Sequence, residues 1–387
     1  MAKAAKNTAD EQDKAQESID SKDVLSKFLE ENKDDHLNFI KTKSYKISTG
    51  SLMWDFYLDG GLRPGLSRFT GPPESGKSSA MLEVVRNFVK EKSRKALYID
   101  SECRLSDDIK RRCGLKFATD AKDWHDGVIF HYKGNVYEGA INLIQQLVNN
   151  NEADTTYCFV IDSMDSLILR DDYNKTFEEN VKVAGSPALT KRFFQKLGAK
   201  LSVMGHLVLI ATQYSSNIEI QYTASTDKRP KQGGGGWALA HFANFAFDFS
   251  ETFGGDIIKE NDALPPSVTN PILGKRVKVK FTKSTNEQTQ MTITYPIKTK
   301  VVGKSSIWRG MELIDFLVMF KQLEGKQWIS FKDTSFYSEL EKAGAVLPES
   351  GKWNGKVKLL AWIDSDEKAK TWLDAKLSDL LSVASGS

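Results

Sequence analysis

The chain has 387 residues, of which 40% are hydrophobic and 27% are charged. This composition is typical of a folded globular protein, and it excludes a wholly disordered, fibrous or collagen-like chain. Its 54 basic and 51 acidic residues give a formal net charge of only +3, so a nucleic acid would have to bind a local basic surface. No run approaches the roughly 18 apolar residues of a transmembrane helix, and the N-terminus lacks the apolar core of a secretory signal. We therefore expect a cytoplasmic protein with no membrane partner.

The N-terminal region divides into two parts. Residues 1–22 are rich in Ala, Lys, Asp, Glu and Ser, and predict a mobile tail. From Ser21 to about Ile40, apolar residues return at helical spacing, which predicts a short amphipathic segment outside the main core. We interpret residues 23–45 as an oligomerisation segment. It could pack on its own domain or on a neighbouring copy of the protein.

The middle of the chain alternates apolar runs of strand length with amphipathic helices. The sequence predicts strands over Ser67–Thr70, Ala96–Asp100, Cys158–Asp162 and Leu207–Ala211, and helices over Ser79–Lys90, Val136–Val148 and Leu189–Leu201. Short β-rich runs bounded by helices indicate an α/β fold with a mostly parallel sheet that is covered on both faces. Ligands of such sheets bind at the carboxyl ends of the strands.

The pattern changes after Asn244. Arg276–Lys283 and Thr289–Tyr295 alternate polar and apolar residues, as antiparallel strands do, and Gly303–Gly325 is typical of a helix with flanking turns. We expect a core domain over residues 46–320 and a small α-rich C-terminal domain over residues 321–387. Its last helix is expected to begin near Asp364.

The segment from Gly71 to Ser78 fits the phosphate-loop pattern G-x-x-x-x-G-K-[ST] in full. Glycines let backbone N–H groups approach phosphates, and the following helix adds a partial positive charge at its N-terminus. Lys77 would reach the terminal phosphates, and the Ser78 hydroxyl would ligate Mg²⁺. The candidate nucleotide-binding residues are Gly71, Pro72, Pro73, Glu74, Ser75, Gly76, Lys77, Ser78 and Ser79.

Three further strands end in polar side chains. Asp162, after Cys158-Phe-Val-Ile, is placed to hold a Mg²⁺ shell, and Glu102, after Ala96-Leu-Tyr-Ile-Asp-Ser, could orient an attacking water. Gln213 follows Leu207-Val-Leu-Ile-Ala-Thr, and its amide could sense a γ-phosphate. Parallel strands would bring all three ends to one edge of the sheet.

With these motifs the sequence resembles the RecA-type recombinases of bacteria and their phages. The resemblance runs from about residue 44 to the C-terminus. Its most specific part is Ile47-Ser-Thr-Gly-Ser-Leu52 followed by Asp55, a segment that separates this family from most other phosphate-loop ATPases. The other matching motifs follow in the family's order: Gly60-Gly-Leu, Gly65, the phosphate loop, Tyr98-Ile-Asp-Ser-Glu102, Val160-Ile-Asp-Ser163, Gln213, and Gly235-Gly236 followed by Ala238-Leu239.

The resemblance implies a RecA-like ATPase core and a DNA-dependent ATPase that uses ATP and Mg²⁺. Such proteins form filaments on single-stranded DNA, pair it with homologous duplex DNA and exchange strands, in recombination and DNA repair. The implied setting is a bacterial or phage-infected bacterial cell, with mediator and single-strand-binding proteins as partners. On matching positions, Lys77 binds phosphate, Ser78 and Asp162 serve Mg²⁺, Glu102 positions water and Gln213 senses ATP.

The family places DNA-binding loops after the Asp162 strand and after the Gln213 strand. Here they correspond to residues 170–187 and 215–240, and Arg192 matches a basic position of the family. The second loop combines apolar side chains that can stack on bases with cations that neutralise phosphates. Its candidate DNA-binding residues are Ile218, Ile220, Tyr222, Lys228, Arg229, Lys231, Gly235, Gly236 and Trp237.

Two departures from the family concern the nucleotide. The family usually has an aromatic residue seven positions beyond the Glu102-type carboxylate, to stack on adenine, and here that position is Ile109. Lys280 and Lys283 fit the family's lysines that reach the triphosphate of the neighbouring subunit only in part, since Phe281 occupies one expected position. Solvated lysines on an edge strand are the alternative reading of this run.

Two other classes of function use the same core. One is a hexameric ATPase motor such as a helicase, and the other is a mediator paralogue without catalysis. The Ser-Thr-Gly-Ser segment and the Gly-rich second loop favour the filament over the ring. Lys77, Asp162 and Glu102 argue against a non-catalytic paralogue. The three cysteines, Cys103, Cys113 and Cys158, form no CxxC pair and are expected to be reduced core thiols.

Overall fold

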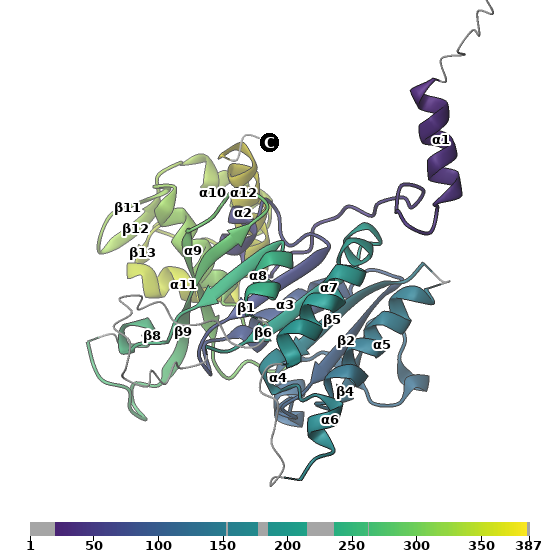
Figure 1. Cartoon of the computed structure of the whole chain (residues 1–387). Helices are drawn as coiled ribbons and strands as arrows, with labels where there is room; N and C mark the ends of the chain where they lie inside the picture. The colour runs from purple at the N-terminus through teal and green to yellow at the C-terminus, as the bar shows by residue number, and fades with distance from the viewer. Residues whose placement is uncertain (1–19, 152–153, 177–184, 215–235, 262, 385–387) are drawn as a thin grey trace, which may run out of the picture. The chain divides into compact units, whose positions relative to one another are not determined.

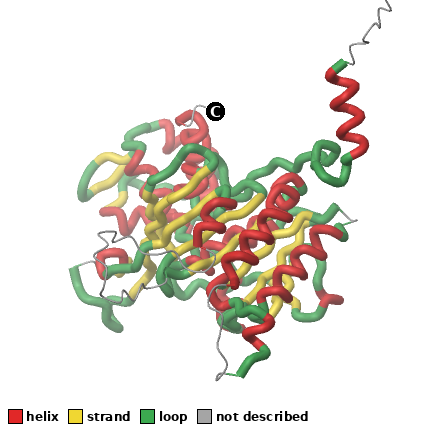
Figure 2. The backbone as a smooth tube through the Cα atoms, in the orientation of Figure 1, coloured by secondary structure: helices red, strands yellow, loops and turns green. Residues whose placement is uncertain are grey.

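The computed structural model describes residues 20–151, 154–176, 185–214, 236–261 and 263–384 of the chain (Figures 1 and 2). The chain consists of two compact units, Met1–Lys41 and Thr42–Ser387. Among the described residues, no helix is both long enough and apolar enough to cross a membrane.

The first unit contains helix α1 (Ser21–Glu31). The helix begins at Asp20, whose side chain accepts a hydrogen bond from the Lys22 backbone N–H. None of its residues is buried, and the side chains of Val24, Leu25 and Phe28 are 53%, 58% and 57% exposed. The predicted amphipathic segment is therefore helical, while its role in oligomerisation stays a prediction. The predicted mobile tail lies almost wholly outside the described residues.

The second unit is built on a ten-stranded sheet with the order β10-β9-β7-β1-β6-β5-β2-β4-β3, and β8 pairs with β9. The strands from β7 to β3 in this order run parallel, and β9 pairs antiparallel with β7, β8 and β10. Their bounds are β1 Gly65–Thr70, β2 Arg94–Asp100, β3 Lys116–Ala118, β4 Val128–Lys133, β5 Thr156–Asp162, β6 Leu207–Thr212, β7 Phe245–Phe249, β8 Ile257–Lys259, β9 Ile272–Ser284 and β10 Thr292–Lys298.

Helices lie on both faces of this sheet, and Figure 1 shows α5 and α7 side by side along one of them. The helices of this region are α2 Leu52–Tyr57, α3 Lys77–Phe88, α4 Asp107–Cys113, α5 Tyr137–Asn149, α6 Arg170–Tyr173, α7 Gly185–Val203 and α8 Gly236–Phe242, with 3₁₀ turns at Ala121–Asp123, Met164–Ser166 and Gly254–Asp256. The strand side chains alternate between two apolar clusters. Ala96 and Tyr98 pack with α2 and α3, whereas Leu97 and Ile99 pack with α5, α7 and α8. The predicted α/β fold with a mostly parallel, doubly covered sheet is confirmed.

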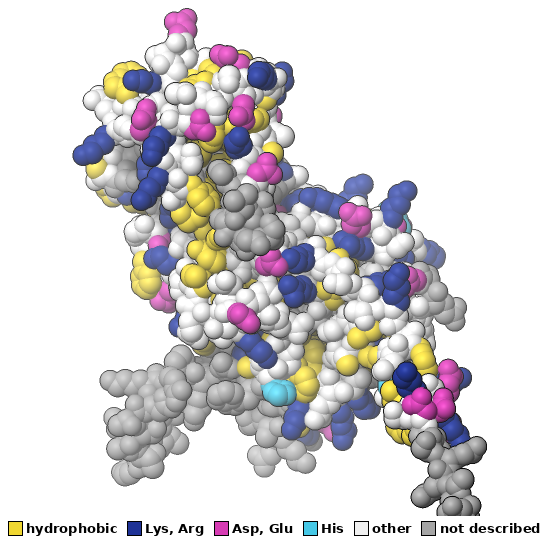
Figure 3. Space-filling view, turned by 90° about the horizontal axis from the view of Figure 1, so that it is seen from above, with side chains coloured by type: hydrophobic (Ala, Val, Ile, Leu, Met, Phe, Trp, Pro, Cys, Tyr) yellow, Lys and Arg dark blue, Asp and Glu magenta, His cyan; other side chains and the backbone are white. Residues whose placement is uncertain are grey.

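The antiparallel edge follows the predicted period of two. Val277, Val279 and Phe281 of β9 are buried against α2 and β10, and the lysines between them are partly exposed. On the face shown in Figure 3, basic and acidic side chains are interspersed.

The C-terminal part forms a third apolar cluster. It contains α9 Arg309–Met319, α10 Ser335–Lys342, α11 Gly355–Ser365 and α12 Glu367–Ala384, with a small sheet of β11 Leu323–Glu324, β12 Trp328–Phe331 and β13 Trp353–Asn354. The last helix, α12, begins at Glu367, close to the predicted start at Asp364. The Asp366 carboxylate accepts hydrogen bonds from the Lys368 and Ala369 N–H groups and starts α12 there.

Candidate functional site

The carboxyl ends of β1, β6, β5 and β2 are neighbours in the sheet, and they open into one cleft of about 470 Å³. Because these strands are parallel, the segments that follow them meet there. Nine of the predicted site residues line the cleft: Pro73, Glu74, Lys77, Ser78, Ser79, Glu102, Ile109, Asp162 and Gln213. The strand ends that the sequence indicated are thus brought together.

The phosphate loop turns sharply between β1 and α3. Gly71 has a φ of +154° and lies so close to β7 that an added Cβ would be 2.6 Å from the Phe249 carbonyl oxygen. Gly76 has a left-handed φ of +105° and begins α3. Ser75 donates to the Pro72 carbonyl oxygen at 2.8 Å and closes the loop on itself. Gly71, Pro72, Ser75 and Gly76 therefore shape the loop behind the residues that line the cleft.

Lys77 is the first residue of α3 and is 7% exposed. Its Nζ donates to the carbonyl oxygens of Gly71 at 2.8 Å and Pro72 at 2.7 Å. Burial lowers the pKa of this ammonium, and the nearby carboxylates of Asp162, Asp165 and Glu102 oppose that effect. The cleft therefore offers a buried cation for an anionic group, and the acids beside it could hold a metal cation that accompanies that group.

Ser78 and Asp162 meet beside this lysine. The Ser78 side chain hydrogen-bonds to the Asp162 carboxylate, and the Tyr98 hydroxyl donates to Asp162 Oδ2 at 2.5 Å. Burial raises the pKa of Asp162, so a nearby cation would favour its ionised form. A hydroxyl and a carboxylate are the oxygen donors that Mg²⁺ takes together with phosphate oxygens. Among the described residues no group of three or more His, Cys, Asp or Glu side chains could hold a metal by itself.

Glu102 is held by a set of hydrogen bonds at the next strand end. Its Oε1 accepts from Ser163 Oγ at 2.6 Å and from Ser166 Oγ at 2.8 Å, and its Oε2 lies 2.9 Å from Arg104 Nη1. Burial opposes ionisation of the carboxyl, but the two serine hydroxyls and Arg104 outweigh it and lower the pKa of Glu102. Glu102 is therefore an ionised acceptor, suited to orienting a water rather than to binding a proton strongly.

Gln213 connects the end of β6 to Glu102. Its Nε2 donates to Glu102 Oε1 at 3.3 Å, and its backbone N–H donates to Asp165 Oδ2 at 2.6 Å. This amide contact is longer than the two serine contacts to the same oxygen. Gln213 can therefore exchange it for another acceptor at the least cost.

Apolar and basic side chains from two further segments also line the cleft. Residues 105–113 contribute Leu105, Ile109, Arg112 and Cys113, and the segment 297–306 contributes Ile297, Lys298, Lys300 and Lys304. Two contacts hold this segment in place. The Gly303 N–H donates to the carbonyl oxygens of Arg111 and Arg112 at the end of α4, and the Ser306 N–H donates to Glu83 of α3. Ile109 thus lines the cleft, and its part in holding a base stays a prediction.

Several predicted residues lie away from the cleft. Lys283 Nζ donates to the carbonyl oxygens of Ala240 at 3.0 Å and His241 at 2.7 Å, at the end of α8. Lys280 is opposite Asp248 on β7, and Arg192 is exposed on α7. None of these three lines the cleft of this chain. Their predicted roles across an interface or on DNA stay predictions.

The two predicted DNA-binding loops are shorter than the sequence indicated. Helix α6 begins at Arg170, and α7 begins at Gly185, inside the first loop. Helix α8 begins at Gly236, inside the second loop, so Gly236 and Trp237 belong to a helix. Ile218, Ile220, Tyr222, Lys228, Arg229, Lys231 and Gly235 lie outside the described residues.

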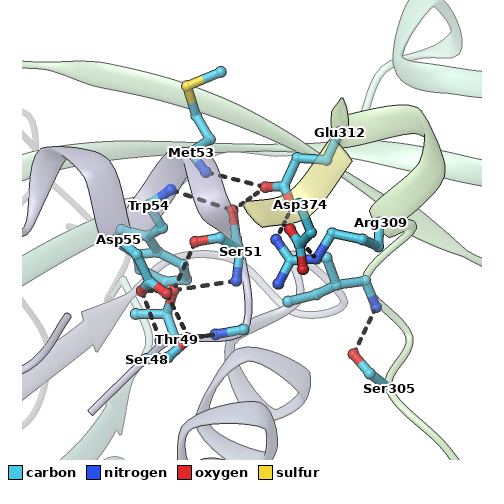
Figure 4. A network of polar contacts seen from close by, with 12 residues as sticks. Ser48, Thr49, Ser51, Met53, Trp54, Asp55, Ser305, Arg309, Glu312 and Asp374 are labelled. Atoms are coloured by element: carbon cyan, nitrogen blue, oxygen red, sulfur yellow. Dashed lines mark hydrogen bonds and ion pairs between the residues drawn. The ribbon is translucent and has the colours of Figure 1, made fainter. Parts of the chain in front are cut away.

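The Ser-Thr-Gly-Ser segment forms a polar network away from the cleft (Figure 4). Asp55 accepts from Ser48 Oγ, from the Thr49 N–H and from Thr49 Oγ1. Ser51 Oγ donates to Glu312 of α9, which also pairs with Arg309 at 3.1 Å. Arg309 lies 3.7 Å from Asp374 of α12. We call this set the Ser51–Glu312 network; its members are Ser48, Thr49, Ser51, Asp55, Arg309, Glu312 and Asp374.

Sequence reasoning missed several polar residues of the cleft region. Tyr98, Asp100, Ser163 and Arg104 line the cleft, and Ser166 bonds to Glu102. Tyr98, Asp100 and Ser163 lie within the motifs that the sequence singled out, so alternation along the strand could have placed Tyr98 and Asp100 on one face. The expectation of three core thiols was wrong for Cys103, which is exposed in the turn after β2; all three cysteines are free.

Comparison with known proteins adds little to this geometry. No protein-family model matches the chain, and no curated protein matches its sequence. Among solved structures, the crystal structure of the RadB recombinase is similar over 65% of this chain and 96% of that chain, with 15% identity and a TM-score of 0.41. At this similarity the function rests on the geometry of the site.

Proposed function

We propose that this chain is an ATP-dependent DNA recombinase, which forms filaments on single-stranded DNA and couples ATP hydrolysis to homologous pairing and strand exchange. One observation supports the ATPase part above all others. Lys77, Ser78, Asp162, Glu102 and Gln213 come from three strand ends and one helix, and all of them line one cleft.

The roles follow from the contacts. Lys77 would leave the Gly71 and Pro72 carbonyl oxygens and bind the terminal phosphates, since a charged acceptor bonds an ammonium more strongly than a carbonyl does. Ser78 and Asp162 would hold Mg²⁺, which neutralises charge on the phosphates. Leu105 and Ile109 would contact the base by apolar packing.

Glu102 and Gln213 would link nucleotide binding to hydrolysis. In the structure they are bonded to each other at 3.3 Å. A γ-phosphate is a stronger acceptor for the Gln213 amide than a carboxylate already shared by two serines. Turning Gln213 towards the phosphate would free a lone pair of Glu102 for a water, and would move the segment that follows residue 214. The resemblance places DNA-binding residues in that segment.

Lys283 is the proposed contact with a neighbouring subunit. Burial lowers the pKa of this lysine, and its ammonium is bonded to carbonyl oxygens at the end of α8. To reach the nucleotide of a neighbour it would have to release α8, the helix that ends the second predicted DNA-binding loop. Assembly on DNA could then be coupled to catalysis across the interface.

Four experiments test the proposal. ATP hydrolysis by the full chain should require Mg²⁺ and rise when single-stranded DNA is added, and strand exchange between homologous DNAs should require ATP. Electron microscopy with single-stranded DNA and ATP should show filaments. Rings would favour a hexameric motor, and DNA-independent hydrolysis without strand exchange would refute the recombinase.

The shared site is tested by mixing Lys283→Ala subunits with Lys77→Ala subunits. The mixture should hydrolyse ATP faster than the sum of the two variants alone. Additive rates in co-assembled mixtures would refute the shared site.

A further inference from the structure

A buried carboxylate and a buried histidine meet beneath the turn that carries Glu102. Asp100 is the last residue of β2, and His131 lies on the neighbouring strand β4. His131 Nε2 is 3.0 Å from Asp100 Oδ2, and the two side chains are only 1% and 4% exposed. Asp100 lines the cleft, whereas His131 does not touch it.

The Asp100 carboxylate accepts hydrogen bonds from the turn that follows it. Its Oδ1 accepts from the Arg104 N–H, and its Oδ2 accepts from the Leu105 N–H, each at 3.0 Å. The Asp100 carbonyl oxygen accepts from the Cys103 N–H at 3.4 Å. The turn thus wraps around Asp100, and Glu102 is carried in the middle of it.

The histidine fixes the carboxylate from the other side. His131 faces the rings of Tyr98 and Phe117 edge to face, at centroid distances of 6.4 Å and 6.2 Å. Its Nδ1 is buried, and within the described part of the chain it has no hydrogen-bond partner. An unpaired buried acceptor is tolerated better than an unpaired buried donor, so Nε2 is assigned as the nitrogen that donates to Asp100.

We propose that Asp100 and His131 are positioning residues for ATP hydrolysis: they hold the turn 101–106 so that Glu102 is aimed at the attacking water. The inference rests on the proposed ATPase function. The serines Ser163 and Ser166 bond Glu102 from the β5 side, and the Asp100–His131 pair fixes the backbone on the β2 side. Without the histidine, the carboxylate keeps only its two backbone donors and can rotate away from them. Glu102 would then move with the turn.

The test compares two buried histidines. His131→Leu should lower kcat roughly 10- to 100-fold, since a shift of about 1 Å in a catalytic group can cost about 10²-fold. The affinity for ATP, measured with a fluorescent nucleotide, should change much less. His206→Leu is the matched control, because His206 is 0% exposed and bonds to the Tyr157 N–H near the amino ends of the strands. It should lose stability while keeping its kcat. Equal losses of kcat in the two variants would overturn the inference.

Two further readouts separate positioning from general loss of structure. In the wild type, the Arg104 and Leu105 N–H groups donate hydrogen bonds to the Asp100 carboxylate. In His131→Leu, hydrogen exchange at these two amides should become faster. Unchanged protection there would contradict the inference. Adding His131→Leu to Glu102→Gln should cost little further turnover, because the histidine acts through Glu102. Fully additive losses would overturn the inference. Failure of the wild type itself to hydrolyse ATP would instead refute the proposed function.

Discussion

The cleft and the Ser51–Glu312 network are two polar clusters in the same unit, and they differ in what their charges face. In the cleft, Lys77 and Glu102 are bonded to groups that a ligand could replace, next to open volume. In the Ser51–Glu312 network, the carboxylates of Asp55 and Glu312 are bonded to serine, threonine and arginine side chains of the chain itself. The segment that most clearly marks the family resemblance therefore stabilises the fold, while the proposed catalytic groups lie elsewhere.

Burial acts on both clusters with different consequences. It raises the pKa of Asp55 and of Glu312, against the hydrogen bonds and the arginine that favour their ionised forms. At Glu102 the hydrogen bonds prevail and the pKa is lowered. A carboxylate that stays ionised in an open cleft can act on a ligand, whereas a fully buried one mainly constrains the elements around it. Variants of the two clusters should therefore separate turnover from stability.

The largest effect is expected at Lys77. Lys77→Ala removes the ammonium group that the phosphate loop presents to the cleft at the start of α3. Turnover of ATP should fall by about 10²–10³-fold, the usual cost of losing one preorganised group that stabilises transition-state charge. The far-ultraviolet circular dichroism should be unchanged. Normal turnover in the folded variant would refute the assignment of the loop.

Asp162 should determine the requirement for Mg²⁺. Asp162→Asn keeps an acceptor for Ser78 and Tyr98 but loses the charge, so the Mg²⁺ concentration for half-maximal hydrolysis should rise about 10- to 100-fold. Tyr98→Phe removes only the hydroxyl that donates to Asp162, so it should raise this Mg²⁺ concentration less than Asp162→Asn does. A magnesium titration of the three proteins decides this. Superimposable curves would exclude Asp162 from the metal site.

Ser51 should affect stability without affecting chemistry. Ser51→Ala removes the hydroxyl that donates to the buried Glu312 carboxylate, which should lower the free energy of unfolding by about 1–3 kcal/mol. The kcat of the folded protein should stay at the wild-type value. Urea unfolding and turnover measured on the same preparation check both. A loss of kcat without a loss of stability would give this network a catalytic role.

His206 should produce a smaller, pH-dependent effect. Burial, with Lys43 and Lys200 nearby, lowers the pKa of His206 from 6.5 to about 4. Below pH 6.5 the unfolded chain therefore binds a proton that the folded chain does not, so stability falls as the pH drops from about 6.5 towards 4. The loss should be on the order of 1 kcal/mol by pH 5.5. His206→Gln should flatten this part of the curve; an unchanged slope would exclude His206 as its source.

The fold was predictable from the sequence where local pattern decides it. The apolar runs that end in an acidic residue predicted β2 and β5, and the alternation of lysines with apolar residues predicted β9. The start of the last helix near Asp364 was predicted to within a few residues, whereas α11 was not singled out within the α-rich C-terminal part. The start of α8 inside the second loop was missed because four consecutive glycines indicate no structure of their own.

The site was predictable in part for a similar reason. Parallel strand ends converge, so Asp162, Glu102 and Gln213 could be grouped before their positions were known. The position of the segment 297–306 beside the cleft depends on tertiary contacts, such as the hydrogen bond between Glu83 and Ser306, which lie 223 residues apart in the chain. The contact between Asp100 and His131 joins two strands whose pairing the sequence pattern does not specify. Contacts of this kind come from the tertiary fold and leave no local signal.

The most direct test of the central claim is the separation of ATP binding from hydrolysis at Glu102. Glu102→Gln keeps the size of the side chain and an acceptor for Ser163 and Ser166, but loses the charge that orients the water. ATP affinity, single-stranded DNA affinity and turnover should be measured side by side for this variant, for wild type and for Ser51→Ala. The account predicts that Glu102→Gln binds ATP and DNA like wild type but hydrolyses ATP at least about 10²-fold more slowly, while Ser51→Ala hydrolyses it normally. Unchanged turnover in Glu102→Gln would contradict it.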